Sequence, residues 1–317
     1  MNRAPFSAIL ALMLCLIGGW ATHAAATTVI LGQGNRQLEL TVSDQFSQQG
    51  RDQIVRWIEH LAHSLTLVYG HWPRERWAIS VEPVSGSSDD PIPWAQVHRD
   101  RIDRVAFYVL PSASAETLKH EWTGYHELSH LLLPYRGWGD TWFSEGLASY
   151  YQNILQARAG VISERQMWQK LHDGFARGEA DNRFNGQTLL SVNQNMRENG
   201  GYMRVYWSGA WYFLAADIRL REQSNGLKSL DDALEQLNQC CAKESLSVAA
   251  IIAQLDKSND EQIFENLYRQ VYRSRQMPPF DHLLAELGIT IENDQVKLAP
   301  TGAAAERRAQ FLTSTAL

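Results

Sequence analysis

The sequence predicts an α+β fold in which a half built on a small mixed sheet precedes a helical half. Segments before residue 110 alternate apolar and polar residues, as strands do. After residue 135, apolar residues recur almost throughout at helical spacing. Of the 317 residues, 44% are hydrophobic and 20% are charged, so the chain can bury the core of one large domain or two modest subdomains.

The first subdomain is predicted over residues 27–135. Its strands are expected at 36–43, 76–84 and 104–110, and its first helix at 44–69. That helix carries an apolar stripe made of Ile54, Ile58, Leu61, Leu65 and Val68. Ser114 opens a second helix, which should run to Leu133 because Pro134 cannot continue a helix.

The remainder is predicted as a helical subdomain over residues 136–285, followed by a C-terminal hairpin and tail over residues 286–317. A helix over 141–158 should end at Gly160. Further helices are expected at 164–177, 202–222, 230–237, 248–255, 261–273 and 280–288. The hairpin should turn at Asn293-Asp294, and the last residues form a weak helix or a loose tail.

Residues 1–26 have the order of a secretory signal peptide. Arg3 gives a positive start, an apolar run extends from Ile9 to Ile17, and small residues end at Ala26. The run is shorter than the roughly 20 residues of a membrane-spanning helix, and no later stretch is apolar for long enough. We therefore expect cleavage, export to the periplasm or the cell exterior, and no stable membrane insertion afterwards.

Charge and cysteine content narrow the class of protein further. The net charge of -6 argues mildly against nucleic acid or an anionic membrane surface as the main partner. Cys15 leaves with the signal, so only Cys240 and Cys241 remain, too few for a disulfide scaffold. Because a disulfide between neighbours closes a strained ring, two thiols are the expected state.

A His-Glu-x-x-His motif occupies the predicted helix before Pro134. His126 and His130 are four residues apart, so their imidazoles lie on one helix face and can converge on a single ion. Glu127 is placed where its carboxylate can reach a metal-bound water without binding the metal. The alternative is an ordinary amphipathic helix with two solvated histidines, which the strongly apolar surroundings disfavour.

A catalytic zinc site needs a third protein ligand and a fourth position open to water. One known motif uses a histidine six residues after the second, but Arg136 stands there, which excludes that arrangement. Glu145 is the better candidate because it lies one turn into the next helix, beyond a loop short enough to fold the two helices antiparallel.

The segments "HELSH" and "WFSEGLASYY" resemble the metal-binding segments of the gluzincin metallopeptidases. The stretch from Tyr206 to Leu237 is similar to the glycyl aminopeptidase family within that clan, and the whole resemblance covers roughly residues 125–237. It implies a zincin (thermolysin-like) catalytic domain with one Zn²⁺ ion, placed between the two halves, that acts on a peptide or protein substrate.

The resemblance also implies a role for each site residue. Glu127 would be the general base, and Tyr206 would donate its hydroxyl to the oxyanion, with Tyr202 as the second candidate. Tyr206 could instead be a core aromatic residue. Gly209 and Ala210 would let its helix approach the site closely. The implied zinc ligands are His126, His130 and Glu145.

The chain departs from these relatives in ways that affect specificity. Ser208 replaces a family lysine, and the loop before Glu145 is short, so the pocket rim should be reduced there. Residues 91–101 occupy the region where wider relatives carry an edge-strand motif that holds a substrate amine. Aminopeptidase specificity therefore does not follow.

Several other side chains near the motif have two interpretations. Ser149 and Asp140 are candidates to orient the histidines, although Asp140 is equally suited to cap a helix. His60 and His63 are expected on a solvated face. Trp138, Trp142 and Phe143 could line a substrate cleft, but we expect them to pack in the core.

The function predicted from these features is a secreted zinc peptidase. The alternatives are a catalytically inactive zinc-binding scaffold or binding protein, and a zinc hydrolase of a non-peptide amide. Glu127 argues against the inactive scaffold, because a structural metal needs no base.

Overall fold

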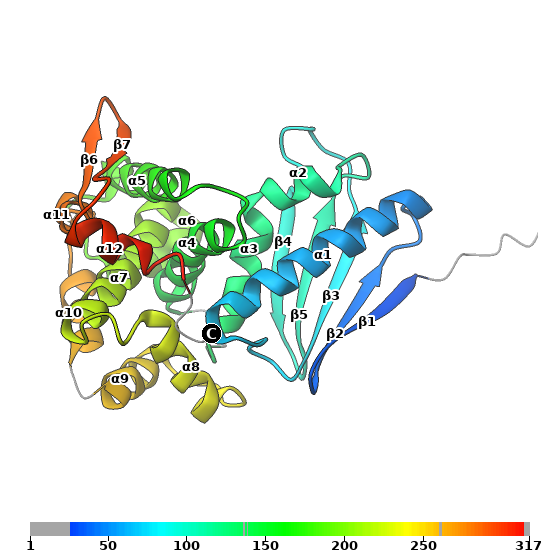
Figure 1. Ribbon diagram of the computed structural model, residues 1–317, viewed down its shortest axis with the longest axis horizontal. Coiled ribbons are helices and arrows are strands. Elements are labelled where there is room, and N and C mark those ends of the chain that lie inside the picture. The colour runs from blue at the N-terminus through cyan, green and yellow to red at the C-terminus, as the bar shows by residue number, and fades with distance from the viewer. Residues whose placement is uncertain (1–25, 136, 138, 260–261, 314–317) are drawn as a thin grey trace, which may run out of the picture.

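A five-stranded mixed sheet forms one half of the molecule (Figure 1). The computed structural model describes residues 26–313 apart from 136, 138, 260 and 261, so the predicted signal peptide lies outside the described residues except for Ala26. The strand order is β1-β2-β3-β5-β4. The strands are β1 (Thr27–Gln33), β2 (Arg36–Val42), β3 (Arg76–Pro83), β4 (Trp94–Arg99) and β5 (Asp103–Val109).

Two of these strands were not predicted, and both lie at sheet edges. β2, β3 and β5 pair in parallel and form the centre, whereas β1 and β4 add antiparallel at the two edges. β4 carries no fully buried side chain, so its sequence lacks the alternation that marks a strand. Its pairing with β5 relies on backbone hydrogen bonds, which leave no side-chain pattern.

Helix α1 (Gln48–Tyr69) runs across one face of the sheet, as Figure 1 shows. Its apolar stripe is buried, and Trp57 meets Phe107 of β5 edge to face at 5.1 Å between ring centroids. Ser47 caps the helix by accepting from the Gly50 N–H. Gly70 ends it in the left-handed conformation with φ of 72°.

The predicted single helix over 114–133 is wrong, because the chain breaks it into three pieces. These are α2 (Ala115–His120), α3 (Trp122–Ser129) and a 3₁₀ turn, η1 (His130–Leu132). Glu121 is extended, with φ of -74° and ψ of 132°, and its carboxylate accepts from the Trp122 N–H at 3.1 Å. The side chain thus starts a new helix, which periodicity does not reveal.

The other half is helical, as predicted, and ends in a hairpin. The predicted turn is confirmed, since Asn293 and Asp294 have φ of 50° and 60°. Helix α6 was not predicted, and the C-terminal residues form a helix, α12, rather than a loose tail. The elements are α4 (Thr141–Arg158), α5 (Glu164–Ala180), η2 (Asn182–Phe184), α6 (Leu189–Asn199), α7 (Tyr202–Gln223), α8 (Leu230–Cys241), α9 (Val248–Asn259), α10 (Ile263–Tyr272), α11 (Asp281–Glu286), β6 (Ile289–Glu292), β7 (Gln295–Leu298) and α12 (Ala303–Ala309).

Two glycines let α4 and α7 cross in close contact. A Cβ atom on Gly146 would lie 2.3 Å from the Gly209 Cα atom. A Cβ atom on Gly209 would lie 1.9 Å from the Trp142 carbonyl oxygen. Trp142 and Phe143 are fully buried beside this contact, which confirms their core role, whereas Trp138 lies outside the described residues.

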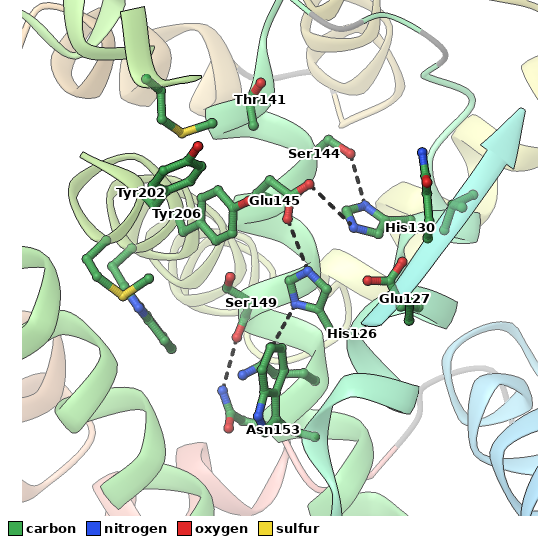
Figure 2. Close-up of a pocket in the computed structure, with 18 of the residues that line it drawn as sticks. His126, Glu127, His130, Thr141, Ser144, Glu145, Ser149, Asn153, Tyr202 and Tyr206 are labelled. Atoms are coloured by element: carbon green, nitrogen blue, oxygen red, sulfur yellow. Dashed lines mark hydrogen bonds and ion pairs between the residues drawn. The ribbon is translucent and has the colours of Figure 1, made fainter. Parts of the chain in front are cut away.

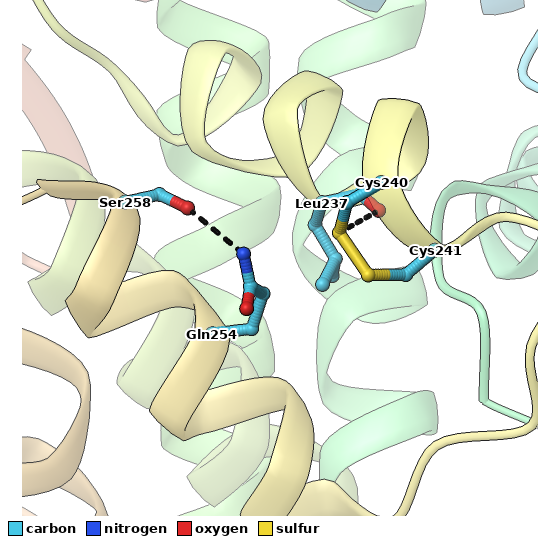
Figure 3. Close-up of a disulfide and its surroundings, with 5 residues drawn as sticks. All are labelled: Leu237, Cys240, Cys241, Gln254 and Ser258. Atoms are coloured by element: carbon cyan, nitrogen blue, oxygen red, sulfur yellow. Dashed lines mark hydrogen bonds between the residues drawn. A yellow bond between two sulfur atoms is a disulfide. The ribbon is translucent and has the colours of Figure 1, made fainter.

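The expectation of two thiols at Cys240 and Cys241 is wrong, because a disulfide joins them (Figure 3). The two residues are the last of α8. Whether neighbouring cysteines can close a ring depends on the local backbone where the helix ends, and residue spacing alone does not report it. In the described part of the chain, no helix combines the length and the apolarity that a bilayer crossing requires.

Candidate metal centre

The three predicted ligands converge from three neighbouring elements of the fold (Figure 2). His126 belongs to α3, His130 begins η1, and Glu145 lies in α4. The Glu145 carboxylate lies between the imidazoles, with Oε2 3.1 Å from His126 Nε2 and Oε1 3.7 Å from His130 Nε2. One ligand atom from each residue lies within 4.8 Å of the others. The structure therefore brings together the residues that the sequence singled out.

The other nitrogen of each imidazole is held by a side chain of α4. His126 Nδ1 lies 2.8 Å from Gln152 Oε1, and His130 Nδ1 lies 3.0 Å from Ser144 Oγ. An amide oxygen only accepts, so His126 donates from Nδ1, and Nε2 is the nitrogen that faces the Glu145 carboxylate. Two electron-pair donors that face each other across about 3 Å are suited to a shared cation.

The predicted orienting residues, Ser149 and Asp140, do not fill this role. The Ser149 carbonyl accepts from Asn153 Nδ2 at 3.0 Å, and the Asp140 side chain makes no cap hydrogen bond although it precedes α4. Gln152 could have been found from spacing, because it follows Glu145 by seven residues and therefore lies on the same helix face.

Burial and nearby charge set the protonation of the site. Burial raises the pKa of Glu127 to about 7, with Glu145 adding to the rise and His126 opposing it. Burial lowers the pKa of His130 to about 4, which leaves the imidazole neutral at pH 7. Burial acts to raise the pKa of Glu145, but the charges of His130 and His126 outweigh it and hold the value at about 2.

The Glu145 carboxylate also sets the protonation of His126. Burial alone lowers the pKa of its imidazole, but the hydrogen bond and the charge of Glu145 outweigh burial and raise it. In the protein without a metal, a proton on His126 thus balances the carboxylate. A divalent cation bound to the same nitrogen would replace that proton, which is the usual competition at histidine ligands.

Tyr206 of α7 points to the same carboxylate (Figure 2). Burial raises the pKa of its hydroxyl, with the Glu145 carboxylate adding to the rise, so the hydroxyl stays protonated. Trp207, Trp211 and Tyr212 are buried, whereas Tyr206 is only partly buried and lines the pocket. Tyr202 is 43% exposed at the same pocket, with its ring 6.2 Å from that of Tyr206. The structure thus places Tyr206 at the site rather than in the core.

A pocket of about 1200 Å³ surrounds these residues, and both the sheet half and the helical half contribute to its lining. It is lined by residues of β4, α3, α4, α5, α6 and α7. Trp94 of β4 is 60% exposed at this pocket, and the Trp122 ring lies 5.5 Å from that of His126. The unpredicted edge strand therefore contributes directly to the cleft.

The described residues contain no second group of this kind. His63 is exposed, but His60 is half-buried and its Nε2 lies 2.9 Å from the Tyr125 hydroxyl, so the expectation of a fully solvated pair is wrong. The donor set of two imidazole nitrogens and one carboxylate oxygen is one that catalytic zinc ions use. The residues present therefore fit a zinc ion.

Comparisons with known proteins agree with this geometry. Residues 137–208 match the M61 glycyl aminopeptidase family. Among curated proteins, none matches. Among solved structures, the chain is similar to an aminopeptidase N family protein from Idiomarina loihiensis, with 17% identity, a TM-score of 0.63, and coverage of 84% of this chain and 50% of that one.

An M1 zinc metallopeptidase from Deinococcus radiodurans is also similar, with 18% identity, a TM-score of 0.51, and coverage of 80% of this chain and 52% of that one. A variant of the Deinococcus radiodurans enzyme bound to a Tyr-Ser-Ala substrate has 16% identity and a TM-score of 0.53, with coverage of 80% and 53%. The chain thus spans about half the length of these structures.

The Deinococcus radiodurans structures are of zinc metallopeptidases, and in this chain the His-His-Glu group is able to hold a metal ion. The expected resemblance is confirmed, since the family match includes the helix that carries the third ligand and the structures share the fold. In its metal-site segment and in its fold, this chain is similar to the gluzincin-type zinc metallopeptidases.

Proposed function

We propose that this chain is an exported zinc-dependent peptidase with a thermolysin-like zincin catalytic domain. His126, His130 and Glu145 bind one Zn²⁺ ion, Glu127 is the general base, and Tyr206 stabilises the oxyanion. The observation that carries the proposal is the convergence of three ligand atoms within 4.8 Å, next to a partly buried glutamate that is not one of them.

A zinc ion bound there supplies Lewis acidity toward a water molecule and a substrate carbonyl. Glu127 accepts a proton from the attacking water and passes it to the leaving amine. The Tyr206 hydroxyl donates a hydrogen bond to the carbonyl oxygen as negative charge develops there.

Comparison of Glu127→Gln with His126→Ala distinguishes the role of a general base from the role of a zinc ligand. We expect Glu127→Gln to retain about one zinc per chain and to lose at least ~100-fold in turnover, because it keeps the ligands and removes the base. His126→Ala should lose both zinc and turnover. Metal analysis of the purified variants and digestion of a broad peptide library give the two readouts.

Equal loss of zinc from both variants would contradict the assigned roles. Wild-type protein that holds zinc but cleaves no peptide in the library would favour the inactive scaffold or the hydrolase of a non-peptide amide. Cleavage of a small amide by wild type and not by Glu127→Gln separates those two alternatives.

A further inference from the structure

The pocket wall formed by α5 and α6 carries more positive than negative charge. Lys170 and Arg177 of α5 and Arg197 of α6 line it. Apart from Glu127 and Glu145, Asp173 is the one acidic residue among the described residues that line the pocket. The cleft around the metal centre therefore has a cationic wall, although the chain as a whole has a net charge of -6.

Asp173 is engaged by polar side chains on its own helix. Its Oδ1 atom accepts from Gln169 Nε2 at 2.8 Å and lies 3.3 Å from His172 Nδ1. In the described part of the chain, no salt bridge within 4.0 Å includes Lys170 or Arg177. The charge of Asp173 thus offsets the two cations only at longer range.

Arg177 is held in place by an aromatic contact rather than by an ion pair. Its guanidinium carbon lies 5.2 Å from the Trp207 ring centroid. Such stacking uses the face of the guanidinium and leaves its N–H groups directed outward in the plane. Lys170 is half-buried, and Glu121 is the other acid that acts on it, while the Glu121 carboxylate accepts from the Trp122 N–H at 3.1 Å.

Arg99 provides an internal comparison, because it also lines the pocket but is already paired. Its Nη1 lies 2.9 Å from Asp103 Oδ2, and its Nη2 donates to the His130 carbonyl. Arg99 thus supports the metal centre, whereas Lys170 and Arg177 face the cleft. The latter two are seven residues apart, about 10 Å along one helix face.

We propose that this site prefers peptides that carry a carboxylate, which Lys170 and Arg177 bind in the cleft. The inference rests on the proposed peptidase function and specifies its substrate class. The carboxylate belongs either to an acidic side chain or to the C-terminus of a short peptide. Both present two oxygen atoms to a guanidinium or ammonium group in the same way.

The test begins with a neutral peptide that the wild-type enzyme cleaves. Each position is changed in turn to Glu or Gln, and the C-terminus is made as the acid or the amide. We expect one Glu peptide, or the free acid, to exceed its neutral partner about tenfold in kcat/KM, as one charge-assisted hydrogen bond provides. The preference should shrink as salt is raised well above about 0.1 M. The preferred form identifies the source of the carboxylate.

Variants then assign the preference to residues. Lys170→Gln or Arg177→Gln should bring the acidic-to-neutral ratio of kcat/KM close to one. Arg165→Gln is the matched control, since Arg165 is an exposed cation of the same helix that does not line the pocket. The acidic-to-neutral ratio of kcat/KM in Arg165→Gln should equal that of the wild-type enzyme. Circular dichroism should show the same helix content in all three variants.

The proposal is overturned if the acidic-to-neutral ratio of kcat/KM is near one in the wild-type enzyme. It is also overturned if that ratio is unchanged in both Lys170→Gln and Arg177→Gln. The peptidase function survives that result, because cleavage of the neutral peptide establishes it separately. If no peptide is cleaved, binding of the Glu and Gln peptides to zinc-loaded protein is measured by tryptophan fluorescence. Tighter binding of the Glu peptide than of the Gln peptide, lost in Arg177→Gln, then supports the proposal. Equal binding of the two peptides by the wild-type protein overturns it.

Discussion

At the scale of single residues, the direction of each imidazole depends on a partner on α4. Gln152 accepts from His126 Nδ1 and Ser144 contacts His130 Nδ1, so both Nε2 atoms face Glu145. Fixing the ring and its tautomer removes the freedom that a metal would otherwise have to restrict. Metal affinity should therefore depend on residues that never touch the ion.

Gln152→Leu removes the acceptor for His126 Nδ1 while keeping a similar volume. We expect zinc affinity to fall by about 10- to 100-fold, as is usual when a group that orients a ligand is lost. Competition against a chromophoric chelator measures the change. Gln152→Glu keeps an acceptor at the same place and should retain affinity, so equal weakening in both variants would point to general disruption of α4.

Tyr206→Phe removes one hydroxyl from the Glu145 side of the pocket. We expect the zinc content to be unchanged and kcat to fall by roughly 100-fold, because the donor acts on charge that develops only in the transition state. Tyr202→Phe, one turn earlier on α7, is the control and should keep most of the activity. A larger loss in Tyr202→Phe would transfer the oxyanion role to Tyr202.

At the scale of elements, the site depends on how closely α7 crosses α4. Glu145 and Gly146 are neighbours on α4, and Gly146 touches Gly209 three residues after Tyr206 on α7. The contact that packs the two helices therefore also sets the distance between the carboxylate and the tyrosine hydroxyl. Packing and catalytic geometry are coupled at this crossing.

Gly146→Ala should destabilise the fold and disturb the site together. The added Cβ atom meets backbone at 2.3 Å, which cannot move aside as a side chain end can, so we expect a loss of about 2–3 kcal/mol in the free energy of unfolding. Urea unfolding measures it. Gly50→Ala in α1 is the control, because its Cβ atom meets its nearest neighbour at 3.4 Å and should be neutral or stabilising.

At the scale of the whole molecule, Arg74 connects the sheet half to the helical half. It precedes β3 and donates to Asp103 of β5 at 2.7 Å, to Asn238 of α8 at 2.9 Å, and to the Leu133 carbonyl just beyond η1 at 3.0 Å. All of these groups are buried or part of the backbone. One side chain thus ties the sheet, a distant helix and the end of the motif segment.

Arg74→Met should cost about 3 kcal/mol in the free energy of unfolding, because it removes a buried ion pair with Asp103 and the hydrogen bonds to Asn238 and the Leu133 carbonyl. Lys243→Met is the matched control, since it breaks an ion pair with Glu75 whose side chains are 84% and 60% exposed, and it should cost at most ~1 kcal/mol. Urea unfolding of both variants gives the comparison, and equal costs would contradict the connecting role of Arg74.

Local periodicity and spacing were sufficient for much of this description. The apolar stripe of α1 and the bounds of α4 and α7 follow from residues close in the chain, and the spacing of His126 and His130 places them on one helix face. The short connection to α4 also indicated Glu145, and the structure brings its carboxylate to both imidazoles.

What the sequence determined by itself was most of the helices and the side chains suited to one metal ion. Tertiary structure decided which strands close the sheet edges, where Glu121 breaks the motif helix, which α4 side chains hold the imidazoles, and that Cys240 and Cys241 are joined. The physical reason is that a repeat pattern records which face of a segment is buried, whereas a hydrogen-bond partner depends on backbone and side chains brought close only by folding.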